Sequence, residues 1–185
     1  MPKEFEEYKG EDIKLFDDKE NWYPWQKEIY SKIFYENNSF KKSDERKIIS
    51  IIDKTGNCGK LSFFKWLFYN HVKDIGKIGY GTASQLRASI TNIGVKKLYI
   101  VDLSRAKGRE DREEDLLAVL NETKSGFVTN AMYGSGITLM MNPPHIIVSS
   151  NYEMKYELLS EDRWEFFEIL ESKKLKQLSI KKRKK

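Results

Sequence analysis

Residues 51–64 read Ile51-Ile52-Asp53-Lys54-Thr55-Gly56-Asn57-Cys58-Gly59-Lys60-Leu61-Ser62-Phe63-Phe64. The apolar start is typical of a strand and the aromatic end of a helix, with a glycine-rich loop between them. This order is what a phosphate-binding P-loop requires, because glycines let backbone N–H groups turn towards one anion and the helix N-terminus adds partial positive charge. We therefore expect a nucleotide to be bound by Gly56, Asn57, Cys58, Gly59, Lys60, Leu61 and Ser62.

Two positions of this loop depart from the usual pattern. Asp53 stands where a first glycine is expected, and Leu61 stands where a Ser or Thr hydroxyl would meet Mg²⁺. If Asp53 pointed inward, its repulsion of phosphate would cost several kcal/mol of nucleotide affinity. If it turned outward, it would pair with Lys54 or cap the loop. Ser62 would replace the missing hydroxyl after a one-residue shift of the loop.

The composition predicts one folded domain with a basic tail. The chain has 185 residues, of which 39% are hydrophobic and 13% aromatic, enough for a core. Residues 173–185 carry eight Lys or Arg and no acid, whereas the other 172 residues carry 25 basic and 28 acidic side chains. The tail is either a nuclear-import or nucleic-acid-binding segment, or a solvated disordered end.

The cysteine count and the lengths of the apolar runs exclude several classes of protein. Cys58 is the only cysteine, which excludes an intrachain disulfide and a cysteine-based zinc site and fits a reducing compartment. No apolar run approaches the roughly 18 residues of a membrane span, and no signal peptide opens the chain. We therefore expect a soluble, intracellular protein.

Strands and helices alternate along the chain, which predicts an α/β sheet with a ligand at the carboxyl ends of its strands. Residues 1–21 are interpreted as a linker, 22–172 as one domain with a helical N-terminal part at 22–45, and 173–185 as a disordered tail. A break is expected around residues 76–81. We predict helices at 22–35, 61–74, 82–92 and 110–124, strands at 48–52, 98–102 and 146–151, and a hairpin formed by 127–129 and 137–141.

Polar residues end two of the predicted strands. Asp102 follows Leu98-Tyr99-Ile100-Val101, and Asn151 follows Ile146-Ile147-Val148-Ser149-Ser150. Beside the Lys60 loop, the aspartate would hold Mg²⁺ or its water shell, and the asparagine would sense the outer phosphate or position the attacking water. The alternatives are a helix cap for Asp102 and a local turn for Asn151.

Several motifs occur in an order that resembles the replication-associated (Rep) proteins of circular single-stranded DNA viruses, such as nanoviruses, circoviruses and their satellites. The resemblance covers roughly residues 8–170 and includes the Gly-Asn-x-Gly-Lys loop. It also rests on Tyr8-x-Gly10-Glu11-Asp12, Trp22-Tyr23-Pro24-Trp25-Gln26, Val101-Asp102-Leu103-Ser104-Arg105, Lys124-Ser125-Gly126, Tyr133, Pro143-Pro144-His145-Ile146-Ile147-Val148-Ser149-Ser150-Asn151 and Leu159-Ser160-Glu161-Asp162-Arg163-Trp164.

This resemblance implies a superfamily 3 helicase domain. Its fold would be an AAA+-like P-loop NTPase, with a central, mainly parallel sheet flanked by helices and a small N-terminal helical segment. Such a domain forms a homo-oligomer, a hexameric ring around single-stranded DNA. It uses ATP and Mg²⁺ to unwind DNA in the 3′–5′ direction during rolling-circle replication in the host nucleus.

The resemblance also implies roles for particular residues. Lys60 would bind the β and γ phosphates, Asp102 the Mg²⁺ with Ser62 as a second ligand, and Asn151 would be the sensor. Arg163 would reach a neighbouring subunit's nucleotide as an arginine finger, or else form a salt bridge with Glu161 or Asp162. The expected DNA contacts are Lys124 and Tyr133, although the alternative of packing in the core is favoured for Tyr133, and Met132 stands where the family usually offers a lysine.

Three functions stay open. The chain would be an active helicase module, a nucleotide-binding module that oligomerises or binds DNA with little hydrolysis, or a nuclear accessory protein that binds nucleic acid through its tail. Asp53, Leu61 and Met132 favour weakened activity. No segment resembles the endonuclease domain of Rep proteins, which carries a His-hydrophobic-His motif and a catalytic tyrosine, so we expect no origin nicking by these residues.

Overall fold

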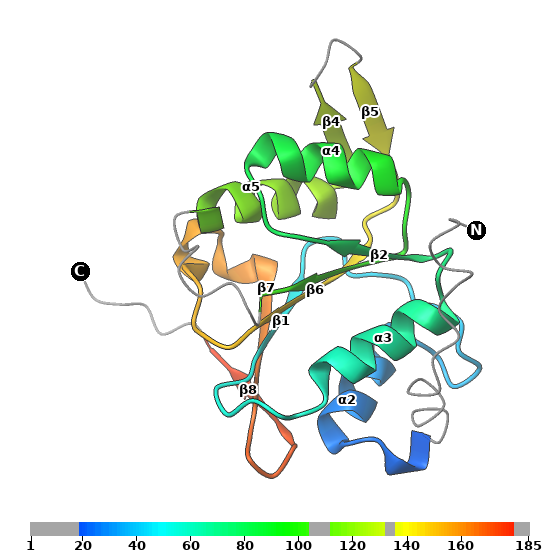
Figure 1. The fold of residues 1–185 in the computed structure, drawn as a ribbon, viewed down its shortest axis with the longest axis vertical. Helices are drawn as coiled ribbons and strands as arrows, with labels where there is room; N and C mark the ends of the chain where they lie inside the picture. Colours follow the sequence, from blue (N-terminus) through cyan, green and yellow to red (C-terminus); the bar gives the residue numbers. More distant parts are fainter. Residues whose placement is uncertain (1–18, 104–111, 132–135, 180–185) are drawn as a thin grey trace.

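A six-stranded sheet is the centre of the computed structural model, which describes residues 19–103, 112–131 and 136–179. The strand order is β2-β3-β6-β1-β7-β8; the first five strands are parallel and β8 is antiparallel to β7 (Figure 1). The predicted α/β class is therefore confirmed. The strands are β1 (Ile48–Ile52), β2 (Ile75–Ile78), β3 (Leu98–Asp102), β6 (His145–Ser150), β7 (Trp164–Ile169) and β8 (Leu175–Leu178).

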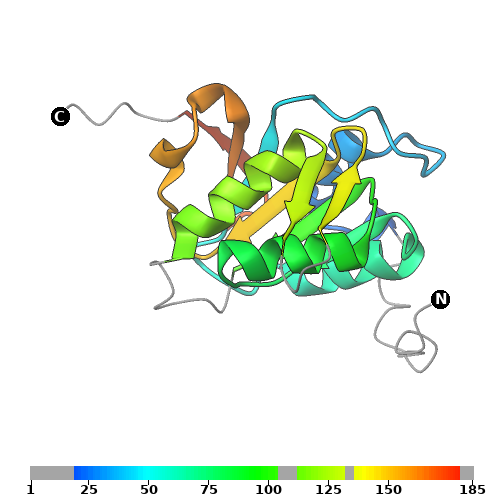
Figure 2. The same ribbon diagram turned by 90° about the horizontal axis from the view of Figure 1, so that it is seen from above.

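Helices cover both faces of this sheet. Helices α2 and α3 lie on one side, and α4 and α5 on the other with the antiparallel hairpin β4–β5 (Figures 1 and 2). Among the described residues, no helix has the length and apolarity to cross a bilayer. The bounds are α2 (Pro24–Ile33), α3 (Lys60–Asn70), α4 (Ala83–Ile93), α5 (Glu113–Lys124), β4 (Phe127–Asn130) and β5 (Ile137–Met140).

The two faces of β1 join two hydrophobic clusters, because successive side chains of a strand point to opposite sides. Ile49 and Ile51 belong to the cluster under α2 and α3, whereas Ile48 belongs to the cluster under α4 and α5. All five residues of β1 are buried, as expected for a parallel strand covered on both faces. The loop that follows β1 therefore starts from a rigid base.

An aromatic cluster joins α2 to α3. Trp22 packs edge-on against Trp66 with ring centroids 4.8 Å apart, and Trp25 packs edge-on against Phe63 at 5.2 Å. Such pairs contribute about 0.5–1.5 kcal/mol each beyond the area they bury. Since Lys60 is the first residue of α3, this packing also fixes the direction in which α3 leaves the loop.

The predicted break at residues 76–81 is partly wrong, because Ile75–Ile78 form strand β2 at the edge of the sheet. Gly76 suggested a break, yet it lies within the strand for a packing reason. A Cβ atom there would lie 2.8 Å from Cγ2 of Ile93 and 3.1 Å from Cδ1 of Tyr99. Glycine lets α4 and β3 approach this strand closely.

The predicted disordered tail at residues 173–185 is also wrong at its start. Residues Leu175–Leu178 form β8, which pairs with β7 from Phe166↔Leu178 to Ile169↔Leu175. Neither strand was predicted, because the charged residues of Trp164–Ile169 and Leu175–Leu178 interrupt the apolar pattern. Residues 180–185 and most of the predicted linker 1–21 lie outside the described part of the chain.

Candidate functional site

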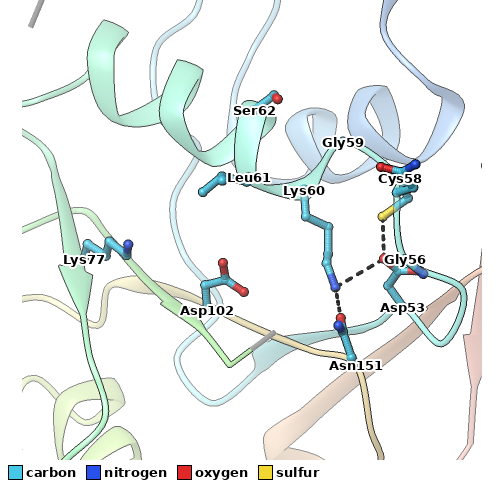
Figure 3. Close-up of a pocket in the computed structure, with 11 residues that line it drawn as sticks. Asp53, Gly56, Cys58, Gly59, Lys60, Leu61, Ser62, Lys77, Asp102 and Asn151 are labelled. Atoms are coloured by element: carbon cyan, nitrogen blue, oxygen red, sulfur yellow. Dashed lines mark hydrogen bonds and ion pairs between the residues drawn. The ribbon is translucent and has the colours of Figure 1, made fainter. Parts of the chain in front are cut away.

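The order of the strands brings three predicted site residues to one edge of the sheet. Strand β6 lies between β1 and β3, so the loop after β1, Asn151 after β6 and Asp102 at the end of β3 are neighbours. All three strands are parallel, and their carboxyl ends meet at this edge. A cavity of about 530 Å³ opens there (Figure 3), lined by Asp53, Gly56, Asn57, Cys58, Gly59, Lys60, Leu61, Ser62, Lys77, Asp102 and Asn151.

The loop after β1 turns through three residues with left-handed backbone conformation. These are Gly56 (φ 73°), Asn57 (φ 58°) and Gly59 (φ 77°), a region that glycine and asparagine tolerate best. Gly59 is the N-cap of α3 and lies against α2, where a Cβ atom would be 3.1 Å from Nε2 of Gln26 and 3.3 Å from the Tyr23 ring. The Gly-Asn-x-Gly spacing thus reflects a tight loop packed against a helix.

The Asp53 side chain points into the loop. One of its carboxylate oxygens, Oδ1, accepts hydrogen bonds from the backbone N–H groups of Gly56 (2.9 Å) and Thr55 (3.2 Å) and from the Thr55 hydroxyl (3.1 Å). The other oxygen, Oδ2, accepts from Cys58 Sγ (2.9 Å) and lies 3.3 Å from Lys60 Nζ. Burial alone would raise the pKa of Asp53, but these hydrogen bonds and the Lys60 charge outweigh it and lower the pKa. Asp53 is thus inward, and it caps the loop.

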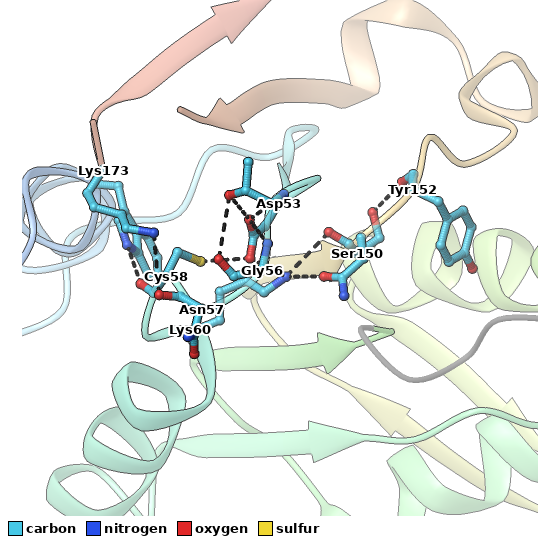
Figure 4. A network of polar contacts seen from close by, with 11 residues as sticks. Asp53, Gly56, Asn57, Cys58, Lys60, Ser150, Tyr152 and Lys173 are labelled. Carbon is cyan, nitrogen blue, oxygen red and sulfur yellow. Dashed lines mark hydrogen bonds and ion pairs between the residues drawn. The ribbon is translucent and has the colours of Figure 1, made fainter. Parts of the chain in front are cut away.

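Lys60 is held by three oxygen atoms at the base of the cavity (Figure 4). Beside the Asp53 carboxylate, its ammonium donates to Oδ1 of Asn151 and to the Ser150 carbonyl at 3.5 Å. The Ser150 hydroxyl donates to the Tyr152 carbonyl at 2.6 Å and fixes the turn that presents Asn151. The predicted pairing of Lys60 and Asn151 at one site is therefore present, with Asp53 as an internal anion.

Cys58 fills space inside the loop. Its side chain is buried, and its thiol donates to Asp53. Burial, followed by the hydrogen bond and charge of Asp53, raises the pKa of the Cys58 thiol to about 12. Because the thiolate is the nucleophilic form, this residue is unreactive at neutral pH.

Few side chains in the cavity could bind a metal ion. Leu61 is 46% exposed at the cavity, and the Ser62 hydroxyl on the next position of α3 points away from Asp102 (Figure 3). Within the described residues, no group of three or more His, Cys, Asp or Glu is placed to hold a metal ion. Mg²⁺ in nucleotide sites needs only one or two carboxylates, with phosphate oxygens and water completing its shell. Asp102 alone meets this minimum.

Lys77 is a lining residue that sequence reasoning missed. It lies on β2 at the edge of the sheet, and Figure 3 shows its side chain directed towards the side of the cavity where Asp102 lies. With Asp53 compensating Lys60, Lys77 supplies a second cation for an anionic ligand. The only available signal was a lysine between Gly76 and Ile78, in a stretch that resembled a turn.

For the nucleotide expected from the sequence, tested as ATP, Lys77→Ala is expected to weaken binding about three- to tenfold, because an exposed cation contributes one charge-assisted contact. Isothermal titration calorimetry measures the change. Lys47→Ala is the matched control. Lys47 is an exposed lysine just before β1, at the amino ends of the parallel strands and away from the cavity. Equal affinities for wild type and Lys77→Ala would remove Lys77 from the site.

Lys124, another predicted site residue, lies away from the cavity. Lys124 was expected to contact DNA, but its side chain is 1% exposed and its ammonium donates to the Ser43 hydroxyl and the Pro144 carbonyl, each at 2.7 Å. A lysine satisfied inside the protein is not available to DNA, so this prediction is wrong. Tyr133, the other expected DNA contact, lies outside the described residues, as does Met132.

Arg163 lies at the amino ends of the parallel strands, whereas the cavity lies at their carboxyl ends. It directly precedes Trp164, which pairs with Ile48 at the start of β1, whereas the cavity follows the end of β1. One alternative for Arg163, a salt bridge with Asp162, is replaced by an ion pair between Asp162 and Arg46. Within one subunit Arg163 does not line the cavity. Its predicted role, contact with a neighbour's nucleotide, stays a prediction.

Comparisons with protein families and with curated proteins identified no relative of this chain: no family model and no curated protein matches it.

Proposed function

We propose that this chain is a nucleoside-triphosphate-binding module of the superfamily 3 helicase kind, with an AAA+-like P-loop fold. One observation carries the proposal: the phosphate-type loop, Asn151 and Asp102 come from three adjacent parallel strands and line one cavity of about 530 Å³. That volume lies within the range of small-molecule sites, and the carboxyl ends of parallel strands are where such sites form.

In this proposal each residue acts on a different part of the nucleotide. Lys60 leaves Asp53 and Asn151 to contact the β and γ phosphates, which carry more negative charge than its present partners. Asn151, released from Lys60, contacts the outer phosphate or the attacking water. Asp102 is the protein ligand for Mg²⁺, which would neutralise phosphate charge when bound. The loop N–H groups complete the phosphate contacts.

Two observations favour binding over rapid hydrolysis. The hydroxyl expected at the metal is replaced by the apolar Leu61, with Ser62 directed away from Asp102. The Asp53 carboxylate sits inside the loop, against Lys60, where it opposes a triphosphate. The second candidate, a nucleotide-binding module that oligomerises or binds DNA with little turnover, rests on these two features.

What the resemblance adds is the helicase context: a ring around single-stranded DNA, with Arg163 acting on the next subunit's nucleotide. Arg163 lies at the amino ends of the parallel strands, opposite the cavity, and this position suits a contact with another subunit. The β4–β5 hairpin projects from the α4–α5 side of the sheet, where the family is expected to meet DNA (Figure 1). Viral replication in the host nucleus belongs to the same proposal.

The direct test is calorimetric titration of the purified chain with ATP and Mg²⁺, together with phosphate release in the presence and absence of single-stranded DNA. We expect saturable binding and slow hydrolysis. If the folded protein binds neither ATP nor ADP at millimolar concentrations, the proposal fails. Binding without any DNA-dependent turnover would favour the second candidate.

Leu61→Ser is expected to raise the rate of ATP hydrolysis about tenfold or more, since a hydroxyl at this position would complete the metal shell beside Asp102. Steady-state phosphate release measures it. Leu61→Ala is the control, because it removes the leucine without adding an oxygen. Equal rates in the two variants would show that the missing hydroxyl does not limit the site.

A further inference from the structure

The carbonyl groups of three consecutive loop residues are held from outside the loop. The Asn57 carbonyl accepts a hydrogen bond from Lys173 Nζ at 3.3 Å, and the Cys58 carbonyl accepts one from the Trp25 indole N–H at 2.9 Å. The Gly59 carbonyl accepts one from Gln26 Nε2 at 3.3 Å. The donors come from two distant parts of the chain: Trp25 and Gln26 from α2, and Lys173, labelled in Figure 4, from the turn between β7 and β8.

These bonds fix the direction of the loop's N–H groups. In a trans peptide the C=O of one residue and the N–H of the next point in opposite directions. Holding the carbonyls of Asn57 and Cys58 against α2 and the turn therefore directs the N–H groups of Cys58 and Gly59 to the other side of the loop. Successive N–H groups on one side form an anion-binding concavity.

The donors themselves are rigid. Trp25 is fully buried, with its ring packed edge-on against Phe63. Gln26 is 1% exposed, and its Oε1 accepts the Tyr23 backbone N–H at 2.8 Å, so its amide has one orientation. A donor whose side chain is locked by packing and hydrogen bonds holds the loop in one conformation better than a mobile donor does.

The C-terminal turn is tied to the same frame. The Lys173 carbonyl accepts the backbone N–H of Trp25 at 3.0 Å, which joins the turn to the start of α2. Lys173 has a left-handed backbone (φ 59°), and its N–H donates to the Leu170 carbonyl at 2.9 Å. Its ammonium reaches Asn57 from this closed turn. A segment more than a hundred residues along the chain thus contacts the loop directly.

We propose that Trp25, Gln26 and Lys173 are positioning residues that preform the phosphate loop, so that the β7–β8 turn is part of the nucleotide site. This inference rests on the proposed function. It assigns a role to a basic residue of the C-terminal region that is unrelated to nucleic acid, since the Lys173 side chain orients a peptide group rather than a ligand.

The test compares ATP affinities of Lys173→Met, Lys173→Arg and Lys174→Met by calorimetry. Lys173→Met is expected to bind ATP about three- to tenfold more weakly, because one hydrogen bond to the loop is lost. Lys174→Met removes the same charge from the adjacent exposed residue and is expected to bind as wild type. Lys173→Arg keeps a donor and should restore most of the affinity, which separates positioning from general electrostatics.

Trp25→Phe and Gln26→Glu extend the test to α2. Phenylalanine keeps a ring against Phe63 but has no N–H for Cys58. Glutamate keeps the acceptor for Tyr23 and replaces the donor to Gly59 by an oxygen. Both are expected to weaken ATP binding about three- to tenfold, with faster amide hydrogen exchange at Cys58 and Gly59 in the ATP-bound protein. Urea unfolding confirms that each variant is folded.

The outcomes separate the two proposals. If wild type binds no ATP, the proposed function fails. If wild type binds ATP and the Lys173→Met, Trp25→Phe and Gln26→Glu variants bind it equally well, the function stands and the positioning role is overturned. Equal losses in Lys173→Met and Lys174→Met would also overturn it, because charge alone would then explain the effect.

Discussion

Lys60→Met is expected to lower the affinity for ATP about a hundredfold, the largest effect of any single change in the cavity. Its ammonium is buried at the base of the cavity, between the loop and Asn151. Removing a buried, hydrogen-bonded partner of a charged ligand costs about 2–5 kcal/mol. Calorimetric titration with ATP measures the loss. Lys54→Met is the control, since Lys54 is half exposed and pairs with Glu153 and Glu168 outside the cavity.

The same change also disturbs the free protein. Without Lys60, the buried Asp53 carboxylate keeps its hydrogen bonds but loses its only cation within 4 Å among the described residues. Leaving a buried charge unpaired costs about 3–5 kcal/mol of folding stability. A loss of ATP binding in Lys60→Met alone would therefore not distinguish a missing phosphate contact from a damaged loop.

Adding Asp53→Asn to Lys60→Met separates these effects. Asparagine keeps an acceptor for the Gly56 and Thr55 N–H groups and carries no charge. We expect the double variant to regain stability in urea and still fail to bind ATP. Asp53→Asn alone is expected to bind ATP more tightly than wild type, because the internal anion opposing the phosphates is gone. A double variant that binds ATP like wild type would contradict the role of Lys60.

The elements nearest the cavity were the most predictable from the sequence. Strands 48–52 and 98–102 were predicted with the bounds that the structure has, because both are short apolar runs followed by a polar residue. That Asp102 and Asn151 would lie beside the Lys60 loop followed from the rule that parallel strands share a carboxyl edge. Local pattern and one topological rule were sufficient there.

Features that depend on distant contacts were not predictable. Strand β7 carries Glu165 and Glu168, whose charges obscure its apolar pattern and which pair with Lys32 and Lys54 in the folded chain. The direction of Asp53 depends on hydrogen bonds to Gly56 and on the position of Lys60. Neither follows from spacing along the sequence.

Lys124 shows most clearly how a motif match misleads. Its position at the end of α5 resembled a family segment that precedes a DNA-binding hairpin, but the last turn of α5 faces the core. The side chain reaches the Pro144 carbonyl before β6 and the Ser43 hydroxyl in the loop before β1. The apolar part of a lysine side chain can pack in the interior while its ammonium group reaches hydrogen-bond acceptors in neighbouring loops. Those loops are remote in sequence.

Burial of Lys124 leads to the second large prediction, a dependence of stability on pH. Burial lowers the pKa of Lys124 to about 8 from 10.5; the nearby Arg163 acts in the same direction and Asp44 in the opposite one. The unfolded chain therefore binds more protons than the folded one between pH 8 and 10.5. Stability from this group is complete above pH 10.5 and is lost as pH falls towards 8. It amounts to about 2 kcal/mol between pH 8 and 10.

Other groups act in the opposite sense over the same range. The pKa of Cys58 is raised to about 12, and burial raises the pKa of Tyr30 and Tyr99 to about 12. For these groups the unfolded chain loses its proton first, so their contribution to stability falls as pH rises above about 9. The pH profile of wild type alone would therefore be nearly flat or would decline.

Comparison with Lys124→Met isolates the lysine. The variant keeps the Cys58 and tyrosine contributions and replaces the ammonium by a side chain of similar length. We expect the free energy of unfolding of wild type, minus that of Lys124→Met, to rise by about 2 kcal/mol between pH 8 and 10. Urea denaturation followed by circular dichroism at several pH values measures it. A difference that does not change with pH would show that Lys124 titrates as an exposed lysine does, which the buried contacts to Ser43 and Pro144 argue against.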